Sequence, residues 1–197
     1  MGERNYLVEG VSGAGKTTVA EELERRGYQA VHGDRVLARR GDPTTGQVVD
    51  EPLAGWSLEQ RHRHHIWDVE QVKALVTDHS RPLTFFCGGS RNSAMFLDLF
   101  DGVFVLEVDV ETLDRRLDVR PADEFGNMPE ERALVLRVHL TREDLPAGGI
   151  STDATRPVTD VVDEILRHVE ADARFIGGFA VDDVRFQSQD APVSGRV

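Results

Sequence analysis

The residues best suited to chemistry form a glycine-rich loop near the start of the chain, Gly10-Val11-Ser12-Gly13-Ala14-Gly15-Lys16-Thr17. They match G-x-x-x-x-G-K-[ST] at every fixed position. Glycines let such a loop wrap so that backbone N–H groups point at phosphate oxygens, and the following helix adds its positive N-terminus. Lys16 should reach the β- and γ-phosphates, and the Thr17 hydroxyl should bind Mg²⁺. The sequence therefore predicts a site for Mg-ATP, with Thr18 as a further contact.

Asp34 is the first candidate on the side of a phosphoryl acceptor. It follows Gly33 at the end of an apolar segment, and ligands bind at the carboxyl ends of strands in open α/β sheets. Its carboxylate would accept the proton of an acceptor hydroxyl or orient that hydroxyl. If the acceptor is a phosphate, Asp34 would instead order a water molecule bound to magnesium. The structural alternative is an N-cap of the next helix, and one residue can do both.

Arginines supply the remaining candidates for phosphate chemistry. Arg91 follows Gly88 and Gly89, so its guanidinium could fork onto a carboxylate or phosphate. Arg116 and Arg120 share a helix face at spacing i, i+4, and could neutralise charge on the transferring group. The alternatives are a solvated loop arginine and a solvated basic face. Two later arginines, Arg132 and Arg137, are further candidates for the same region.

Asp109 bears on a different function. It follows a strongly apolar segment and so resembles the Walker B carboxylate that holds Mg²⁺ in many ATP-hydrolysing proteins. The favoured interpretation is an N-cap for the helix that begins at Val110. Cys87 is interpreted as a buried small hydrophobe rather than a nucleophile.

Three histidines and two tryptophans complete the candidates. His62, His64 and His65 lack a full set of metal ligands, so structural or acceptor-contacting roles are favoured over a metal site. Trp56 and Trp67 are favoured as packing residues, with a stacking contact to the acceptor as the alternative.

The elements that must position these residues follow from hydrophobic patterning. Strands are predicted at 5–9, 28–32, 83–87, 103–108 and 150–152. Helices are predicted after the glycine loop as far as Gly27, shortly after residue 35, and at 57–79, 94–100, 110–120, 130–141 and from 157 onward. The alternation of strands and helices implies a parallel sheet covered on both faces. The pattern fails after 174, so 175–197 is predicted to be an extension, partly disordered, with a small hairpin at Gly177-Gly178.

Composition sets the remaining bounds. The chain has 197 residues, a formal net charge of −12 and a hydrophobic fraction of 40%, which suit one globular domain. The acidic balance argues against a nucleic-acid polymer as partner, and the apolar runs are too short for a membrane span. A single cysteine and the lack of an apolar signal region predict a cytoplasmic protein.

Taken together, these segments resemble the P-loop nucleotide and small-molecule kinases, which include adenylate-kinase-like, shikimate-kinase-like and gluconate-kinase-like enzymes. The resemblance covers residues 1–174 and rests on five segments in order. They are the glycine loop, Gly33-Asp34, Gly88-Gly89-Ser90-Arg91, Arg116 with Arg120, and Asp153-Ala154-Thr155-Arg156-Pro157.

The resemblance implies a three-layer α/β/α fold with a parallel sheet of about five strands. It implies ATP and Mg²⁺ as cofactors, an acceptor-binding insert at 35–79 and a lid at 116–137. Ala154, Thr155 and Pro157 would lie against the adenine, and Arg35 would join Asp34 and Arg91 at the acceptor.

Two departures from the adenylate-kinase pattern leave the acceptor open. Cys87 stands where those enzymes usually carry Asp, and Leu37 stands where they place an arginine. The acceptor is therefore either a nucleoside or nucleotide or a small hydroxyl compound. The predicted function is phosphoryl transfer from ATP to a small molecule by a monomer or homodimer. A regulatory ATPase without an acceptor and a nucleotide-binding module without turnover are the alternatives.

Overall fold

A five-stranded parallel sheet forms the centre of the protein. A computed structural model describes residues 2–49, 55–121 and 124–176, with side chains as far as residue 171. The strands are β1 (Gly2–Glu9), β2 (Gln29–His32), β5 (Arg81–Cys87), β6 (Gly102–Glu107) and β7 (Ile150–Asp153), in the order β2-β5-β1-β6-β7. Every pairing in this sheet is parallel. The predicted fold class is confirmed, and each predicted strand matches an observed one within a few residues.

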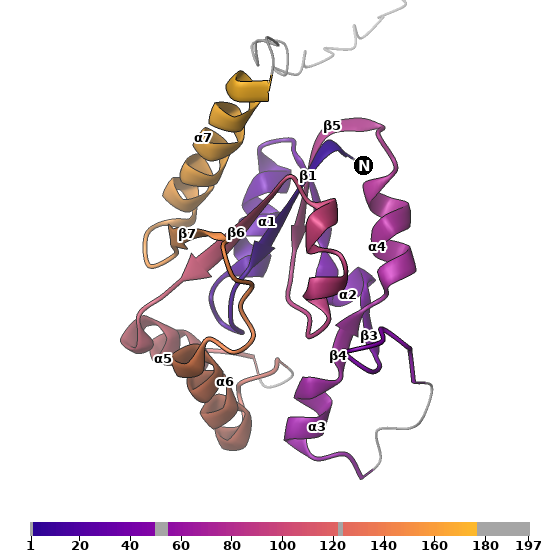
Figure 1. Cartoon of the computed structure of the whole chain (residues 1–197). Helices are drawn as coiled ribbons and strands as arrows, with labels where there is room; N and C mark the ends of the chain where they lie inside the picture. The colour runs from indigo at the N-terminus through magenta and orange to yellow at the C-terminus, as the bar shows by residue number, and fades with distance from the viewer. Residues whose placement is uncertain (1, 50–54, 122–123, 177–197) are drawn as a thin grey trace, which may run out of the picture.

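Helices cover both faces of the sheet (Figure 1). Helices α1 (Lys16–Arg25) and α7 (Val158–Ile176) pack on one face, and α4 (Val69–Val76) lies on the other with two 3₁₀ turns, Ser93–Met95 and Leu97–Leu99. The predicted helix at 94–100 is thus two short turns. The remaining elements are α2 (Gly33–Val36), α3 (Leu58–Arg63), α5 (Val110–Asp118), α6 (Pro129–Thr141) and a small hairpin of β3 (Ala38–Arg40) and β4 (His65–Trp67).

Alternating side chains of the central strands build two cores. In β1, Tyr6 and Val8 face the core that includes α1 and α7, whereas Leu7 faces the other. In β5, Phe85 and Phe86 divide in the same way, and both are fully buried. A strand buried on both faces has no polar side to show, which is why these strands are nearly continuous apolar runs.

The predicted helix at 57–79 is wrong as a single element. Its start is correct, because Ser57 and Gln60 form a complete capping box at the head of α3. The helix ends at Arg63, however, and residues His65–Trp67 form β4, which pairs antiparallel with β3. A second helix, α4, then begins at Val69 and is capped by Asp68, whose side chain accepts the Gln71 N–H.

Tertiary contacts explain this interruption. The Asn92 side chain accepts the Trp67 N–H and donates to the Trp67 C=O, at 2.9 Å each. It thus satisfies the same backbone groups that a neighbouring β-strand would. The Trp67 indole is fully buried and stacks on Phe96 with ring centroids 5.7 Å apart. Burial of this large ring on the sheet requires an extended backbone at 65–67, which outweighs local helix propensity.

The end of the chain is described in part. Helix α7 runs two residues beyond the point where the sequence pattern fails, and the predicted hairpin at 177–178 lies outside the described residues, as does most of the 175–197 extension. Within the described part of the chain, no helix is both long and apolar enough to cross a bilayer.

Candidate active site

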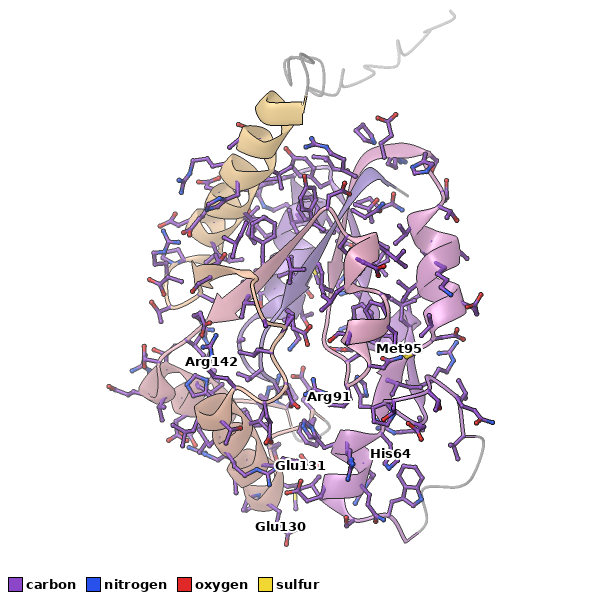
Figure 2. The ribbon with its side chains drawn as sticks, in the orientation of Figure 1. His64, Arg91, Met95, Glu130, Glu131 and Arg142 are labelled. Atoms are coloured by element: carbon purple, nitrogen blue, oxygen red, sulfur yellow. The ribbon has the colours of Figure 1, made fainter. Side chains whose placement is uncertain are left out.

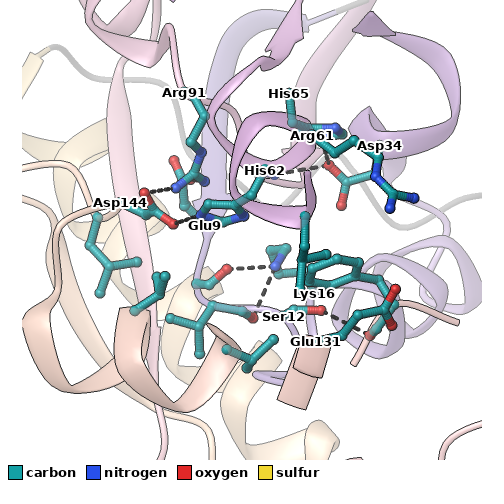
Figure 3. A pocket seen from close by; sticks show the side chains of 18 of the residues that line it. Glu9, Ser12, Lys16, Asp34, Arg61, His62, His65, Arg91, Glu131 and Asp144 are labelled. Atoms are coloured by element: carbon teal, nitrogen blue, oxygen red, sulfur yellow. Dashed lines mark hydrogen bonds and ion pairs between the residues drawn. The ribbon is translucent and has the colours of Figure 1, made fainter. Parts of the chain in front are cut away.

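The glycine loop joins β1 to α1 as predicted. Gly15 has φ = 109°, a left-handed conformation that a side chain would strain, and it directly precedes the first residue of α1. Lys16 Nζ folds back and donates to the carbonyl oxygens of Gly10 at 2.5 Å and Val11 at 3.0 Å (Figure 3). Burial lowers the pKa of Lys16, against the opposing effects of Asp34 and Glu9. An anion would therefore relieve an amine that is poorly solvated.

Two arginines of the predicted lid converge on this loop. Arg116 donates to the carbonyl oxygens of Ala14 at 3.0 Å and Ala154 at 2.7 Å, so it links the loop to the segment after β7. Arg120 donates to Ser12 Oγ at 2.8 Å. The structure thus places both guanidinium groups beside the phosphate loop and not on a free solvent face. The other two candidates pair with carboxylates: Arg132 with Asp114 and Asp118, and Arg137 with Glu59.

Two adjoining cavities open at the carboxyl edge of the sheet. The nucleotide-side groove, of about 790 Å³, runs along the phosphate loop and the start of α1. The acceptor-side pocket, of about 330 Å³, lies between the sheet, α3 and α6. Three residues line both cavities, namely Ser12, Lys16 and Asp34. The lysine that should hold the transferring phosphate therefore stands at the junction of the two spaces.

Most of the predicted site residues line one of the two cavities. The nucleotide-side groove includes Gly13, Ala14, Gly15, Thr17, Thr18, Arg116, Arg120 and Ala154. Gly10, Gly89 and Arg91 line the acceptor-side pocket. Arg35 was expected at the acceptor but lines the nucleotide side. Among the described residues, the cavity linings do not include the predicted Gly88, Thr155 and Pro157. They do include Arg156 and Val158, which line the nucleotide-side groove.

Glu9 is a site residue that the sequence reasoning missed. It is the last residue of β1, 1% exposed, and it lines the acceptor-side pocket. Its Oε2 has no hydrogen-bond partner among the described residues. Burial raises the pKa of Glu9 from 4.5 to about 7, although Arg91 and Lys16 oppose the shift. A charged residue that ends an apolar strand just before the loop, Val8-Glu9-Gly10, was the available signal.

Asp34 lies at the junction, held by two partners. Its Oδ1 accepts the Gly89 N–H at 3.1 Å and lies 3.5 Å from His65 Nε2. Partial desolvation tends to raise its pKa, but His65, Lys16 and the Gly89 N–H outweigh it and lower the pKa of Asp34 to about 2. Arg40 donates to His65 Nδ1 at 3.0 Å. Because arginine only donates, the proton of a neutral His65 is assigned to Nε2, facing Asp34.

Arg91 is held by acidic groups. Figure 2 shows it beyond the carboxyl edge of the sheet, between the segments that carry α3 and α6. Its guanidinium forms an ion pair with Asp144 and lies 3.9 Å from Glu9 Oε1. His62 Nε2 contacts the second oxygen of Asp144 at 2.7 Å, as Figure 3 shows. Burial and the nearby Arg91 lower the pKa of His62 to about 4.

The remaining candidates have structural roles. Asp109 caps α5, accepting from Thr112 N at 2.7 Å and Thr112 Oγ1 at 2.9 Å. Cys87 is buried, and burial raises the pKa of its thiol. No group of three or more histidine, cysteine, aspartate or glutamate side chains placed to hold a metal ion occurs among the described residues. Trp67 is a core residue, and Trp56 packs on His64 with ring centroids 4.9 Å apart.

Solved structures with similar folds include kinases of small molecules. A gluconokinase from Sinorhizobium meliloti 1021 aligns with a TM-score of 0.53 and 19% identity over 88% of this chain and 95% of that chain. A shikimate kinase from Bacteroides thetaiotaomicron aligns with a TM-score of 0.55 and 13% identity over 85% of this chain and 98% of that chain. A deoxyadenosine kinase from M. mycoides with bound dATP aligns with a TM-score of 0.51 and 13% identity over 84% of this chain and 99% of that chain. No protein-family model and no curated protein matches the sequence. The chain therefore has the fold of the P-loop small-molecule kinases, as the resemblance implied.

Proposed function

We propose that the chain is an ATP-dependent phosphotransferase that moves the γ-phosphoryl group onto a hydroxyl of a small molecule. The observation that carries the proposal is the junction of two cavities at Lys16, with Asp34 beside it and Glu9 in the adjoining pocket wall. A phosphate loop explains the first cavity. A second cavity that adjoins the first at the same lysine is what an acceptor requires and simple hydrolysis does not.

The nucleotide would occupy the groove along the glycine loop. Backbone N–H groups and Lys16 would bind the phosphates, and the segment from Ala154 to Val158 would flank the base. The Thr17 hydroxyl and the half-exposed Asp34 carboxylate are oxygen ligands of the kind that Mg²⁺ prefers, directly or through water. When bound, the ion would neutralise charge on the phosphates.

The acceptor hydroxyl would enter from the other pocket. Its oxygen forms a bond to the γ-phosphorus as the bond from that phosphorus to the bridging oxygen breaks, and ADP leaves. The hydroxyl proton passes to the Glu9 carboxylate, whose pKa of about 7 matches the task better than that of Asp34, at about 2. Asp34 orients the hydroxyl. Lys16, Arg116 and Arg120 stabilise the negative charge of the transition state.

Two elements, one from the predicted insert and one from the predicted lid region, would together exclude water. Helix α3 of the insert already touches α6 of the lid region, and Arg137 and Glu59 form an ion pair between them at 2.9 Å. The two helices together cover the acceptor-side pocket, which is lined by Leu58 of α3 and Val138 of α6. Closure of this cover would keep water from competing with the acceptor.

The test is acceptor-dependent turnover. The purified protein is incubated with Mg-ATP and nucleosides, nucleoside monophosphates, sugars, sugar acids, shikimate-like acids or antibiotics, and ADP and phosphorylated product are measured together. ADP that appears with one acceptor class, matched by product, supports the proposal. ADP matched by free phosphate and unchanged across the panel would mean hydrolysis. Lys16→Ala should abolish turnover, whereas Lys73→Ala, at an exposed position on α4, should not.

A further inference from the structure

The chain carries its own counter-ion for Arg91, the arginine that was expected to bind the acceptor. Arg91 lines the acceptor-side pocket, yet its guanidinium forms an ion pair with Asp144 and lies 3.9 Å from Glu9 Oε1. The side chains of Arg91 and Asp144 are only 15% and 13% exposed. Because little water screens this ion pair, a ligand would have to separate it before it could use the charge of Arg91.

The segment that follows α6 holds Asp144 in place. Arg142, the C-cap of α6, has φ = 57° and donates two hydrogen bonds to the Glu107 carboxylate at the end of β6, at 2.8 and 2.6 Å. The Leu145 N–H then donates to the Arg142 carbonyl at 3.1 Å, and the Leu145 side chain packs against the main core. Asp144 lies between these two anchors, so it belongs to the fixed wall of the pocket.

The second oxygen of Asp144 is also occupied within the protein. His62 Nε2 lies 2.7 Å from Asp144 Oδ2, while Arg91 pairs with Oδ1 (Figure 3). Since an ionised carboxylate can only accept, a proton on Nε2 of His62 is assigned to this contact. The Asp144 carboxylate thus has a donor on each oxygen, as the anionic group of a ligand would have if it lay on Arg91.

The other charges of the pocket wall also disfavour a bound anion. Among the described residues, the lining contains as many carboxylates as lysine and arginine side chains, and the carboxylates are those of Glu9, Asp34, Glu131 and Asp144. One of the cations, Lys16, lines the nucleotide-side groove as well and serves the phosphates of the nucleotide. The wall that remains for the acceptor therefore has no excess of positive charge.

We propose that Asp144 is a specificity-determining residue that occupies Arg91 in place of a ligand anion, so that the acceptor is an uncharged polyhydroxyl compound of the sugar or nucleoside class. This inference rests on the proposed function and specifies its substrate class. A hydroxyl can accept from the guanidinium or donate to the carboxylate without separating the ion pair. An acid or a phosphate ester would have to displace Asp144 and leave two anions side by side in a poorly hydrated pocket.

The first experiment uses inorganic phosphate as a probe of Arg91, without turnover. Phosphate is titrated by calorimetry into the protein saturated with Mg²⁺ and the non-hydrolysable ATP analogue AMP-PNP, which fills the nucleotide-side groove. Asp144→Asn keeps the shape of the side chain but removes its charge, and should bind phosphate about ten-fold or more tightly than the wild type, because Arg91 is released for a charged ligand. Glu143→Gln, at an exposed carboxylate one position away and outside the pocket lining, should bind phosphate as the wild type does.

A double variant tests whether this effect acts through Arg91. Arg91→Gln/Asp144→Asn removes both charges of the ion pair and should lose the phosphate affinity that Asp144→Asn gains. A merely structural role of Asp144 would not produce a gain of anion binding that depends on Arg91. Thermal melts establish that each variant is folded.

The second experiment compares acceptors that differ in charge. A neutral sugar is compared with the corresponding sugar acid and sugar phosphate, and a nucleoside with its monophosphate. The wild type should phosphorylate an uncharged acceptor at a kcat/KM about ten-fold or more above that of its charged counterparts, and Asp144→Asn should narrow or invert this ratio mainly through KM. The uncharged acceptor that is used identifies the class. The wild-type comparison needs no variant, so it tests the inference even if Asp144→Asn does not fold.

The outcomes separate this inference from the proposed function. Equal phosphate affinity in the wild type and Asp144→Asn, or a wild-type preference for the charged acceptors, would overturn the role of Asp144 and leave the kinase intact. ADP formed with free phosphate, whatever the acceptor, would overturn the kinase and with it the acceptor class. Phosphate binding gained in Asp144→Asn and lost in the double variant would still show that Asp144 neutralises Arg91.

Discussion

At the scale of single residues, the two carboxylates of the site differ in their surroundings. Glu9 is enclosed by the sheet and has one oxygen without a partner, which favours its neutral form. Asp34 is half exposed, accepts a hydrogen bond from the Gly89 N–H and lies 3.5 Å from His65 Nε2, which favours its charged form. Neighbouring acids with separated pKa values commonly divide the roles of proton acceptor and electrostatic partner.

The pH dependence of turnover distinguishes these roles. If Glu9 accepts the proton, kcat/KM should rise with pH to a plateau with an inflection near its pKa of about 7. Glu9→Gln should lower kcat about 100-fold or more and remove this inflection. Steady-state profiles from about pH 5 to about pH 9 check the prediction. A profile without an inflection, with activity retained in Glu9→Gln, would assign the proton to Asp34, whose pKa of about 2 lies below this range.

The same residue should leave a signature in stability. The folded protein binds the Glu9 proton up to a pKa of about 7, whereas the unfolded chain releases it near 4.5. In that window the native state holds more protons, so the free energy of unfolding falls as pH rises, by about 3 kcal/mol in total. Glu9→Gln should lack this loss. Urea unfolding of the wild type and Glu9→Gln between the two pKa values is the measurement. The same pH dependence of the unfolding free energy in both proteins would contradict the prediction.

At the scale of elements, the strand β4 supports the catalytic segments. The Trp67 indole fills a slot beside Gly33 and Gly88, where an added Cβ would lie 2.1 Å and 2.6 Å from the ring carbon Cζ2. These glycines flank Asp34 and Gly89. The backbone next to Asp34 and Gly89 is thus packed directly on the side chain of Trp67, which belongs to the predicted insert.

A close-packed slot of this kind is sensitive to one methyl group. Gly33→Ala should destabilise the protein by about 2 kcal/mol, because the new Cβ overlaps the indole. The double variant Gly33→Ala/Trp67→Phe should be more stable than the sum of the single changes predicts, since the smaller ring vacates the overlap. Denaturant unfolding of the four proteins closes the cycle. Strict additivity would show that Trp67 does not set the cost.

At the scale of the whole molecule, the parallel sheet gathers the chemistry at one edge. The carboxyl ends of β1, β2 and β5 deliver Glu9, Asp34 and the Gly89 loop to the same place. The chain has a net charge of −12, yet the cavities at this edge are lined by Lys16 and several arginines. In the nucleotide-side groove Lys16 and four arginines outnumber three carboxylates, and such a locally positive groove on an acidic protein suits an anionic ligand.

Ligand binding should be visible as global stabilisation. Mg-ATP at about 100 times its Kd should raise the free energy of unfolding by about 2.7 kcal/mol, which corresponds to roughly 5–10 °C in Tm. Lys16→Ala should lose most of this shift and Lys73→Ala should keep it. Removal of Mg²⁺ with EDTA should reduce the shift in the wild type. Thermal unfolding that is unchanged by Mg-ATP would contradict nucleotide binding in the loop.

The sequence alone determined the features that depend on local order. The glycine loop is one continuous segment, so its pattern and its place between a strand and a helix could be recognised directly. Strands buried on both faces are uniformly apolar, and their alternation with amphipathic helices is enough to predict a parallel α/β sheet. Asp109 as an N-cap and the capping box at Ser57 belong to the same class, because a cap acts over three residues.

Only the tertiary structure decided which charges face one another. Nothing in the order of residues says that Arg91 meets Asp144, that Glu9 lacks a full set of partners, or that Arg40 and Arg61 share a cavity. The break of the predicted helix at His64 has the same origin, since Asn92 and the buried Trp67 impose it from outside the segment. Electrostatics and packing depend on distances between segments remote in sequence, and the folding of the chain sets those distances.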